Sequence, residues 1–392
     1  MVIEDKIKEW VTEALQGGYN PEEIYNILIR RGFDSKEIKE VLSVCTALND
    51  LNALGFKEKE ITEGNILQTK IVKSKEIQEV SKLINATKKE IAKAVMGQDE
   101  IVNACICAIL CDGHVLLEGV PGIAKTLLVK SLAVASGCSA KRIQFTVDLL
   151  PSDIVGVTTF TQNKGFEIIK GPIFANFIIA DEINRSPPKT QSALIEAMQE
   201  KQVTIGRETF KLPLPFFVMA TENPLESSGV YDLPEAQIDR FLFKLILTYP
   251  KRKEEELIME NNMTLKKFEE FDIKPILSPD KILEMQKVAK EIYCDDKIKA
   301  YILDIIEKTR KKDFPHGKYV EWGGSPRASI GLFIAAKSWA LINGRDYVIP
   351  KDVRDVAHYV LRHRLILNYK ARAEKIDSDV IIEEILNKVG LK

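Results

Sequence analysis

The stretch that decides the fold is HVLLEGVPGIAKT, residues 114–126. Its first part is an apolar run that favours a β-strand, and a helical pattern begins at Lys125. The loop between them fits G-x-x-x-x-G-K-[ST] with one substitution, because Ala124 stands where the second glycine is usual. In this pattern backbone N–H groups surround phosphates, the lysine reaches the β- and γ-phosphates and the hydroxyl binds magnesium. Taken alone, the loop could also be a plain turn from a strand to a helix.

The sequence therefore predicts a nucleotide site at this loop, with ATP and magnesium as its ligands. Gly122 and Ala124 carry little or no side chain, so backbone N–H groups can approach a phosphate closely. The predicted nucleotide-binding residues are Gly119, Val120, Pro121, Gly122, Ile123, Ala124, Lys125 and Thr126. Thr126 is also a predicted magnesium ligand.

A second stretch, FIIADEINR at residues 177–185, is an apolar strand that ends in two carboxylates. Ligand sites of open α/β sheets lie at the carboxyl ends of strands. We expect Asp181 to bind magnesium through water, and Glu182 to orient and polarise the attacking water. An isolated Asp-Glu pair is often only a solvated helix start. Its combination with the phosphate loop favours nucleotide hydrolysis.

A third predicted strand, PFFVMAT, delivers Asn223 in the run ATENP. In a parallel sheet this amide could lie beside Glu182 and hold the attacking water or the γ-phosphate. By itself, Asn-Pro is merely a turn signal.

From residue 97 to residue 250 the sequence alternates strand-like and helical patterns. After residue 250 the patterns are helical. This order predicts an α/β fold with a parallel sheet flanked by helices, followed by an all-α second domain. Before them, GYNPEEIYNIL and GFDSKEIKEVL repeat a helix-start pattern that predicts a small helical module. The predicted divisions are a helical module at 1–68, a linker or helix at 69–90, the ATPase core at 91–250 and a helical lid at 251–392.

Composition narrows the class of protein further. The 392 residues are 45% hydrophobic and 29% charged, which is typical of a folded globular protein. Lys and Arg total 56 against 57 Asp and Glu, so no overall basic field favours nucleic acid. We expect no export signal and no membrane insertion, hence a cytoplasmic protein. The cysteines of 101–111 read as small hydrophobic residues of a buried helix, in preference to a metal site.

These motifs, in this order, resemble the MoxR family of AAA+ ATPases. The likeness runs from about residue 97 to the C-terminus. It is carried by QFTVDLLPSDIVG, KGPIFANFIIADEINRSPPKTQSALIEAMQE, QVTIGRETFKLP, ATENPLESSGVYDLPEAQIDRFLF, GGSPRAS and PKDVRDVAHYVLRHRLIL. The resemblance implies an AAA+ P-loop core with a helical lid, and a homo-oligomer, usually a hexameric ring, whose sites are completed by neighbours.

The resemblance also assigns roles to single residues. Arg240 matches the arginine finger, which would reach the γ-phosphate of the adjacent subunit. Arg327 matches sensor 2 and would contact its own subunit's nucleotide, and Asn223 matches sensor 1. Gln98 lies in the segment that runs past the adenine. Arg185 could act on a neighbouring subunit or form a structural salt bridge.

Two segments resemble family insertions that form hairpins: VTTFTQNKGFEIIKGPI, the helix-2 insert, and QVTIGRETFKLP, the hairpin before sensor 1. One residue departs from the family pattern, because Glu222 stands where many members have Gln. The added negative charge beside sensor 1 could slow hydrolysis or alter its coupling.

The resemblance favours a chaperone that uses ATP to remodel or activate partner proteins, often proteins with von Willebrand factor A domains. A magnesium-chelatase-like ATPase subunit is the alternative. A nucleic-acid motor is disfavoured by the balanced charge and by the lack of a recognisable helix-turn-helix or zinc motif.

Overall fold

The computed structural model describes residues 74–119, 125–162, 165–223, 229–247 and 267–390, together with a few isolated residues. The chain divides into two compact units, residues 1–70 and 71–392. The helical module expected at 1–68 lies almost wholly outside the described residues, so it stays a prediction.

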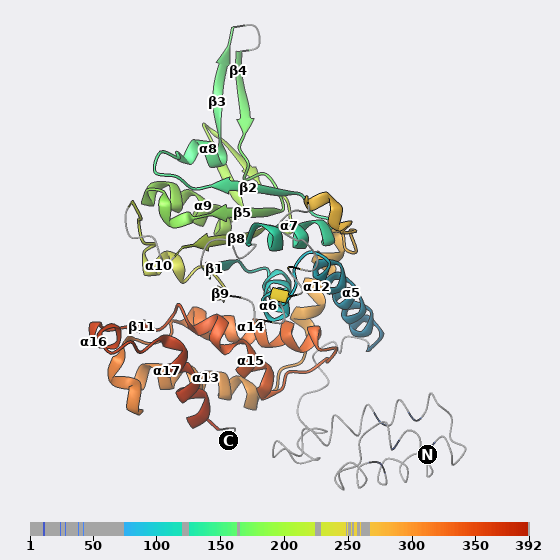
Figure 1. The fold of residues 1–392 in the computed structure, drawn as a ribbon, viewed down its shortest axis with the longest axis vertical. Helices are drawn as coiled ribbons and strands as arrows, with labels where there is room; N and C mark the ends of the chain where they lie inside the picture. Colours follow the sequence, from blue (N-terminus) through green and yellow to red (C-terminus); the bar gives the residue numbers. More distant parts are fainter. Residues whose placement is uncertain are drawn as a thin grey trace. The chain divides into compact units, whose positions relative to one another are not determined.

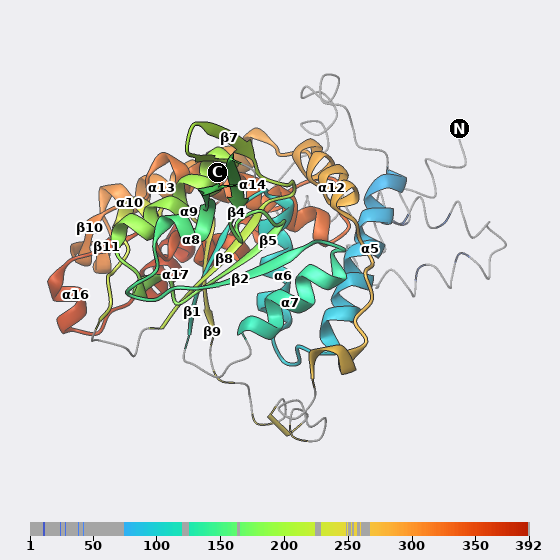
Figure 2. The ribbon, with the colours of Figure 1, turned by 90° about the horizontal axis from the view of Figure 1, so that it is seen from above.

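A parallel sheet forms the centre of the second unit (Figures 1 and 2). Its strands are β1 (Val115–Gly119), β2 (Ala140–Gln144), β5 (Phe177–Asp181), β8 (Phe217–Glu222) and β9 (Phe243–Leu247). They lie in the order β2-β5-β8-β1-β9, and every neighbouring pair is parallel. The predicted parallel sheet is confirmed. Its carboxyl edge gathers the ends of β1, β5 and β8, where the sequence places its candidate residues.

Helices cover both faces of the sheet, because alternate strand residues point to opposite sides. On β1, Val115 and Leu117 join one hydrophobic core and Leu116 joins the other, and all three are fully buried. Burial of each such side chain contributes about 1.5–3 kcal/mol. The helices of the first core include α5 (Ser74–Ala92), α6 (Asp99–Leu110) and α7 (Lys125–Ala135), and those of the second are α8 (Pro151–Val155) and α9 (Pro188–Glu200).

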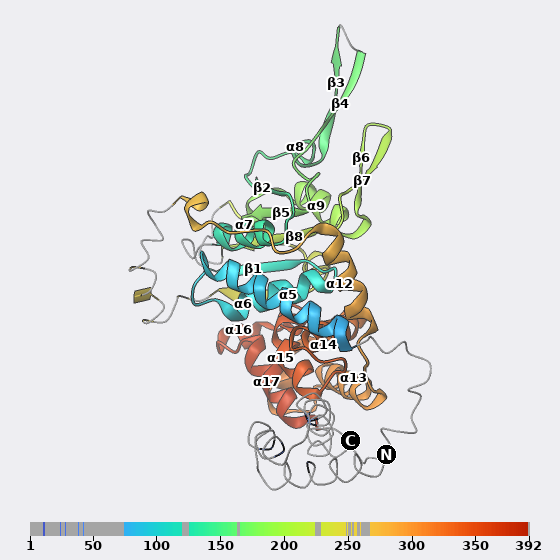
Figure 3. The same ribbon diagram turned by 90° about the vertical axis from the view of Figure 1, so that its right-hand side faces the viewer.

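Two antiparallel hairpins project from the second face (Figure 3). One pairs β3 (Gly156–Thr161) with β4 (Gly165–Lys170), and the other pairs β6 (Gln202–Ile205) with β7 (Glu208–Lys211). A Cβ on Gly206, which has φ +64°, would lie 2.8 Å from the hydroxyl of Thr158, so the hairpins approach each other closely. Both hairpins expected from the sequence are confirmed.

The C-terminal part is mainly helical, as expected. Its longer helices are α12 (Pro279–Glu291), α13 (Asp296–Lys311), α14 (Pro326–Ile342), α15 (Pro350–Leu361) and α17 (Ser378–Lys388). The shorter elements of the unit are α10 (Glu235–Ile238), α16 (Tyr369–Ala373), η1 (Ile183–Arg185), η2 (Phe268–Phe271) and η3 (Pro315–Tyr319). A short antiparallel pair, β10 (Val320–Trp322) with β11 (Ile366–Leu367), also occurs here, and the all-helical expectation missed it.

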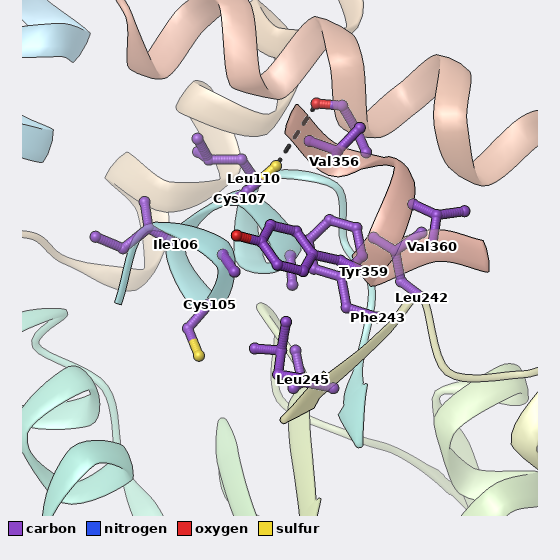
Figure 4. Packing of buried hydrophobic residues seen from close by; sticks show 14 of the residues in the cluster. Cys105, Ile106, Cys107, Leu110, Leu242, Phe243, Leu245, Val356, Tyr359 and Val360 are labelled. Carbon is purple, nitrogen blue, oxygen red and sulfur yellow. Dashed lines mark hydrogen bonds between the residues drawn. The ribbon is translucent and has the colours of Figure 1, made fainter. Parts of the chain in front are cut away.

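One hydrophobic core joins α6 and the sheet to the C-terminal helices (Figure 4). Cys105 and Cys107 are fully buried in it, and burial raises the pKa of both thiols. The predicted buried helix at 101–110 is confirmed. Because this core is continuous, the boundary between ATPase core and lid at 250/251 stays a prediction. Within the described ranges, each helix is too short or too polar to cross a bilayer.

Candidate active site

Lys125 begins α7 at the carboxyl edge of the sheet. Its Nζ donates hydrogen bonds to the carbonyl oxygens of Gly119 and, at 3.1 Å, of Glu222. Burial lowers the pKa of this ammonium group, while the nearby Asp181, Glu182, Glu118 and Glu222 carboxylates act in the opposite direction. The lysine is therefore held between the ends of β1 and β8.

The loop before this lysine is only partly described. Residues 120–124 lie outside the described residues, so the expected phosphate contacts of Val120, Pro121, Gly122, Ile123 and Ala124 stay predictions. Thr126 follows Lys125 in the first turn of α7. The positive end of a helix dipole and free N–H groups at such a terminus favour an anion.

Asp181 ends the buried strand β5, and both of its carboxylate oxygens are fixed. Thr221, on the neighbouring strand β8, donates its hydroxyl to Oδ1 at 2.7 Å. Arg142, on β2, approaches Oδ2 at 2.6 Å from Nη2. The carboxylate therefore has a defined orientation at the sheet edge.

Glu182 has a left-handed backbone, with φ 56°. This conformation costs about 1–3 kcal/mol for a residue with a side chain, and it is often found at functional sites. The Glu182 N–H donates to the Thr221 hydroxyl at 2.9 Å, so one hydroxyl contacts both adjacent acidic residues. The Glu182 Oε2 accepts from Gln144 Nε2 at 2.8 Å and pairs with Arg185 Nε at 3.3 Å. Of the two roles expected for Arg185, the structure shows the salt bridge within the chain.

Asn223 directly follows β8 and is buried. Since β5 and β8 pair in parallel, it reaches the same edge as Glu182, as the sequence predicts. Glu222 lies opposite Glu118 of β1. Burial raises the pKa of Glu222 to about 7; Glu118 and Asp232 raise it as well, while Lys244 and Lys125 oppose the shift. This carboxyl group is therefore partly protonated near neutral pH.

The donors at this edge suit magnesium, which prefers oxygen ligands and usually keeps water and substrate phosphates around one or two protein ligands. The hydroxyl of Thr126 and the carboxylate of Asp181 are such donors. Within the described part of the chain, no three His, Cys, Asp or Glu side chains are grouped as metal ligands.

Arg240 and Arg327 lie together at the opposite edge of the sheet. Arg240 comes before β9 in the chain. The first residue of β9 pairs with the first residue of β1, whereas the phosphate loop follows the last residue of β1. A strand of five residues at about 3.3 Å each separates these edges by roughly 16 Å. The Arg327 Nη1 pairs with Asp239 Oδ2 at 3.2 Å. The structure thus brings Arg327 to Asp239, next to Arg240 in the chain. The contact with its own subunit's nucleotide that the resemblance implies for Arg327 is not tested by these distances.

The reason for this placement is the packing of the lid. Helix α14, which begins just before Arg327, packs against α15, and α15 packs along β9. The Nε of Arg240 is buried, and no described residue accepts a hydrogen bond from it. Arg327 therefore lies at Asp239, at the same edge of the sheet as Arg240.

Gln98 immediately precedes α6, and its side chain makes no capping hydrogen bond to that helix. Its backbone oxygen accepts from the Val102 N–H at 3.0 Å. The adenine contact expected for Gln98 stays a prediction.

Sequence reasoning missed Thr221, Arg142 and Gln144, which fix the two acidic residues. Each comes from a strand next to β5, so its role depends on the register between strands. The one signal in the sequence was the polar Thr221 at the end of the apolar run PFFVMAT.

Comparisons with known proteins agree with this geometry. Residues 114–243 match the ATPase family associated with various cellular activities (AAA), and residues 316–385 match the AAA lid domain. Chaperone MoxR1 of Mycobacterium tuberculosis is 46% identical over 308 residues, which cover 77% of this chain and 80% of that protein. The uncharacterized protein YeaC of Bacillus subtilis is 44% identical, with 78% and 94% covered. A crystal structure of a candidate ATPase from Cytophaga hutchinsonii is 44% identical with a TM-score of 0.76, covering 81% of this chain and 97% of that one.

Proposed function

This chain belongs to the MoxR family of AAA+ ATPases and hydrolyses ATP, and we propose that it acts as a chaperone that remodels or activates partner proteins from within a hexameric ring. The relative named as a chaperone is 46% identical to it, which supports the chaperone role. The contacts at the two edges of the sheet support the ring.

Within one subunit, the carboxyl edge binds and orients the reactants. Residues 119–126 surround the phosphates, with the Lys125 ammonium on the β- and γ-phosphates. Thr126 and, through water, Asp181 would hold magnesium, which would supply positive charge to the phosphates. Glu182 orients and polarises the attacking water, while Asn223 holds that water or the γ-phosphate. Thr221 supports this arrangement by fixing the Asp181 carboxylate and the Glu182 backbone together.

The observation that carries the ring is the position of Arg240. It comes before β9 in the chain, whereas the phosphate loop follows β1, and the length of β1, roughly 16 Å at about 3.3 Å per strand residue, separates these two edges of the sheet. Its Nε is buried without an acceptor among the described residues. We infer that Arg240 stabilises the γ-phosphate of a neighbouring subunit, and that Arg327, which shares Asp239 with this segment, faces the same neighbour.

Dilution tests this composite site. ATP turnover per chain is expected to rise with protein concentration, in step with ring formation measured by mass photometry. If a monomer at high dilution kept full turnover per chain, the composite site would be ruled out.

The proposed partners are proteins with von Willebrand factor A domains, and the proposed compartment is the cytoplasm. We further propose that 91–250 works as the ATPase core, 251–392 as the lid, and 1–68 as a docking module joined through 69–90. Limited proteolysis of a purified protein with a von Willebrand factor A domain tests the chaperone role. Its cleavage pattern is expected to change with this chain and ATP but not with a Glu182→Gln chain. An unchanged pattern in both cases would contradict the proposal.

A further inference from the structure

A buried arginine from the lid binds the segment that contains Arg240. Arg364 lies three residues after the end of α15, and its side chain is only 3% exposed. Its Nε donates to Asp239 Oδ1 at 2.9 Å. Its Nη2 donates to the carbonyl oxygens of Asp239 at 3.1 Å and Phe241 at 2.7 Å, and its Nη1 to that of Leu242 at 3.0 Å. One guanidinium group therefore holds the backbone on both sides of Arg240.

Apolar contacts attach the same segment to the lid. Leu242 and Phe243 lie among Val356, Tyr359 and Val360 of α15 in one buried cluster (Figure 4). A glycine in α14 also lets this helix come close to α15 and to Leu242. A Cβ on Gly331 would lie 3.0 Å from Val360 Cγ1 and 3.5 Å from Leu242 Cδ1.

The carboxylate of Asp239 joins this segment to a second lid residue. It accepts from Arg364 at 2.9 Å and from Arg327, on α14, at 3.2 Å. Burial lowers the pKa of Arg364 to about 10, which still leaves it charged at neutral pH. The two positive charges from the lid thus share one negative charge next to Arg240.

We propose that Arg364 is a positioning residue for Arg240: it fixes residues 239–242 to α15, so that the arginine finger moves with the lid. The inference rests on the proposed function, in which Arg240 completes a neighbour's site. A lid that shifts in one subunit then shifts the guanidinium that this subunit presents to the next one. The connection runs through a continuous set of hydrogen bonds and packed side chains.

The test is the ATP turnover of Arg364→Met, alone and in mixtures. Displacement of a catalytic group by a distant mutation costs about 10²-fold in rate, so kcat is expected to fall by that factor while KM for ATP changes little. Excess Lys125→Ala chains, which lack the phosphate-binding lysine but keep both arginines, are expected to restore turnover. The rescue follows because Arg364→Met chains retain an intact phosphate site and borrow a well-placed Arg240 from the neighbour.

Arg362→Met is the matched control. Arg362 lies two residues earlier and binds Asp379 and the Lys244 carbonyl oxygen, both at distances of 2.8–2.9 Å, without contacting residues 239–242. Its kcat is expected to stay near wild type. If Arg364→Met does not fold, Arg364→Lys, which keeps the buried charge but not the planar fork of donors, takes its place.

The outcomes separate this inference from the proposed function. A folded Arg364 variant with wild-type kcat would overturn it. The positioning role would also be overturned if Lys125→Ala chains rescued Arg240→Ala but did not rescue the lower kcat of Arg364→Met in the same assay. If Arg240→Ala itself is not rescued, the composite site fails, and the positioning role fails with it.

Discussion

The carboxyl edge of the central sheet and the opposite edge present their charged groups differently. At the carboxyl edge, Lys125, Asp181 and Glu182 all have hydrogen-bond partners within the chain. At the opposite edge, the Nε of Arg240 is buried without an acceptor among the described residues, and Arg327, although paired with Asp239, is 49% exposed. The first edge is ordered by contacts within one chain. The second has guanidinium groups whose proposed ligand belongs to another chain, so the two edges call for different tests.

Loss of Arg240 is expected to have the largest effect. An arginine finger contributes about 10³–10⁵ in rate by stabilising transition-state charge, so Arg240→Ala should lose turnover to that extent. ATP affinity, measured by calorimetry, should stay close to wild type because the carboxyl edge is intact. Arg372→Ala, at an exposed residue of α16, is the control and should be active. A loss of ATP affinity equal to the loss of rate would place Arg240 in its own chain's site.

At the carboxyl edge, Glu182→Gln is expected to lower turnover by about 10²–10⁴, the usual contribution of a positioned base. Binding should persist, since the contacts of Lys125 remain. Single-turnover rates with radiolabelled ATP measure the chemical step directly. Glu196→Gln, on the exposed face of α9, serves as the control. Near wild-type single turnover would remove Glu182 from catalysis.

Thr221→Val should have a smaller effect at the same edge. The change removes a hydrogen bond to a carboxylate, worth about 1.5–3 kcal/mol, and leaves the Glu182 N–H without its acceptor. If this energy appears in the transition state, kcat falls roughly 10–100-fold. Thr209→Val is the matched control, because its hydroxyl bonds Thr204 on an exposed hairpin. Equal kcat values for the two variants would show that Thr221 does not orient the acidic pair.

Glu222→Gln should act mainly on stability, through pH. Because burial raises the folded-state pKa of Glu222 to about 7 from its ordinary value of 4.5, the folded state binds more protons than the unfolded state between these values. Wild-type stability therefore falls as pH rises through this window, by at most about 3 kcal/mol at 1.36 kcal/mol per pKa unit.

The glutamine variant should lack this dependence. Thermal melting at pH 5 and pH 8 measures it, with the wild-type Tm falling more between the two values than that of Glu222→Gln. Parallel changes in Tm for both proteins would mean that Glu222 titrates normally.

The sequence predicted the carboxyl edge better than the opposite edge. The phosphate loop and the pair Asp181 and Glu182 are local motifs at strand ends, so the strand order that the structure shows brings them together. Thr221, Arg142 and Gln144 could not be assigned, because their contacts depend on strand register. The strand of Thr221 was predicted correctly all the same.

The opposite edge depends on how the lid packs, which no local pattern encodes. The motif around Arg327 identified the residue, but it did not specify which edge of the sheet the residue approaches. Asp239 and Arg364 are separated by 125 positions, so their hydrogen bond depends on how α15 packs along β9. Short paired strands such as β10 and β11 were likewise missed, since two or three residues carry too weak a periodic pattern.

The most direct test of the central claim is ATP turnover in mixtures of Arg240→Ala and Lys125→Ala chains. Each variant alone should be nearly inactive, the first for lack of a finger and the second for lack of nucleotide binding. Mixing should restore part of the activity, because an interface can then pair an intact phosphate site with an intact Arg240. Activity in the mixture that equals the sum of the separate variants, while mixed rings form, would contradict a site shared between two chains.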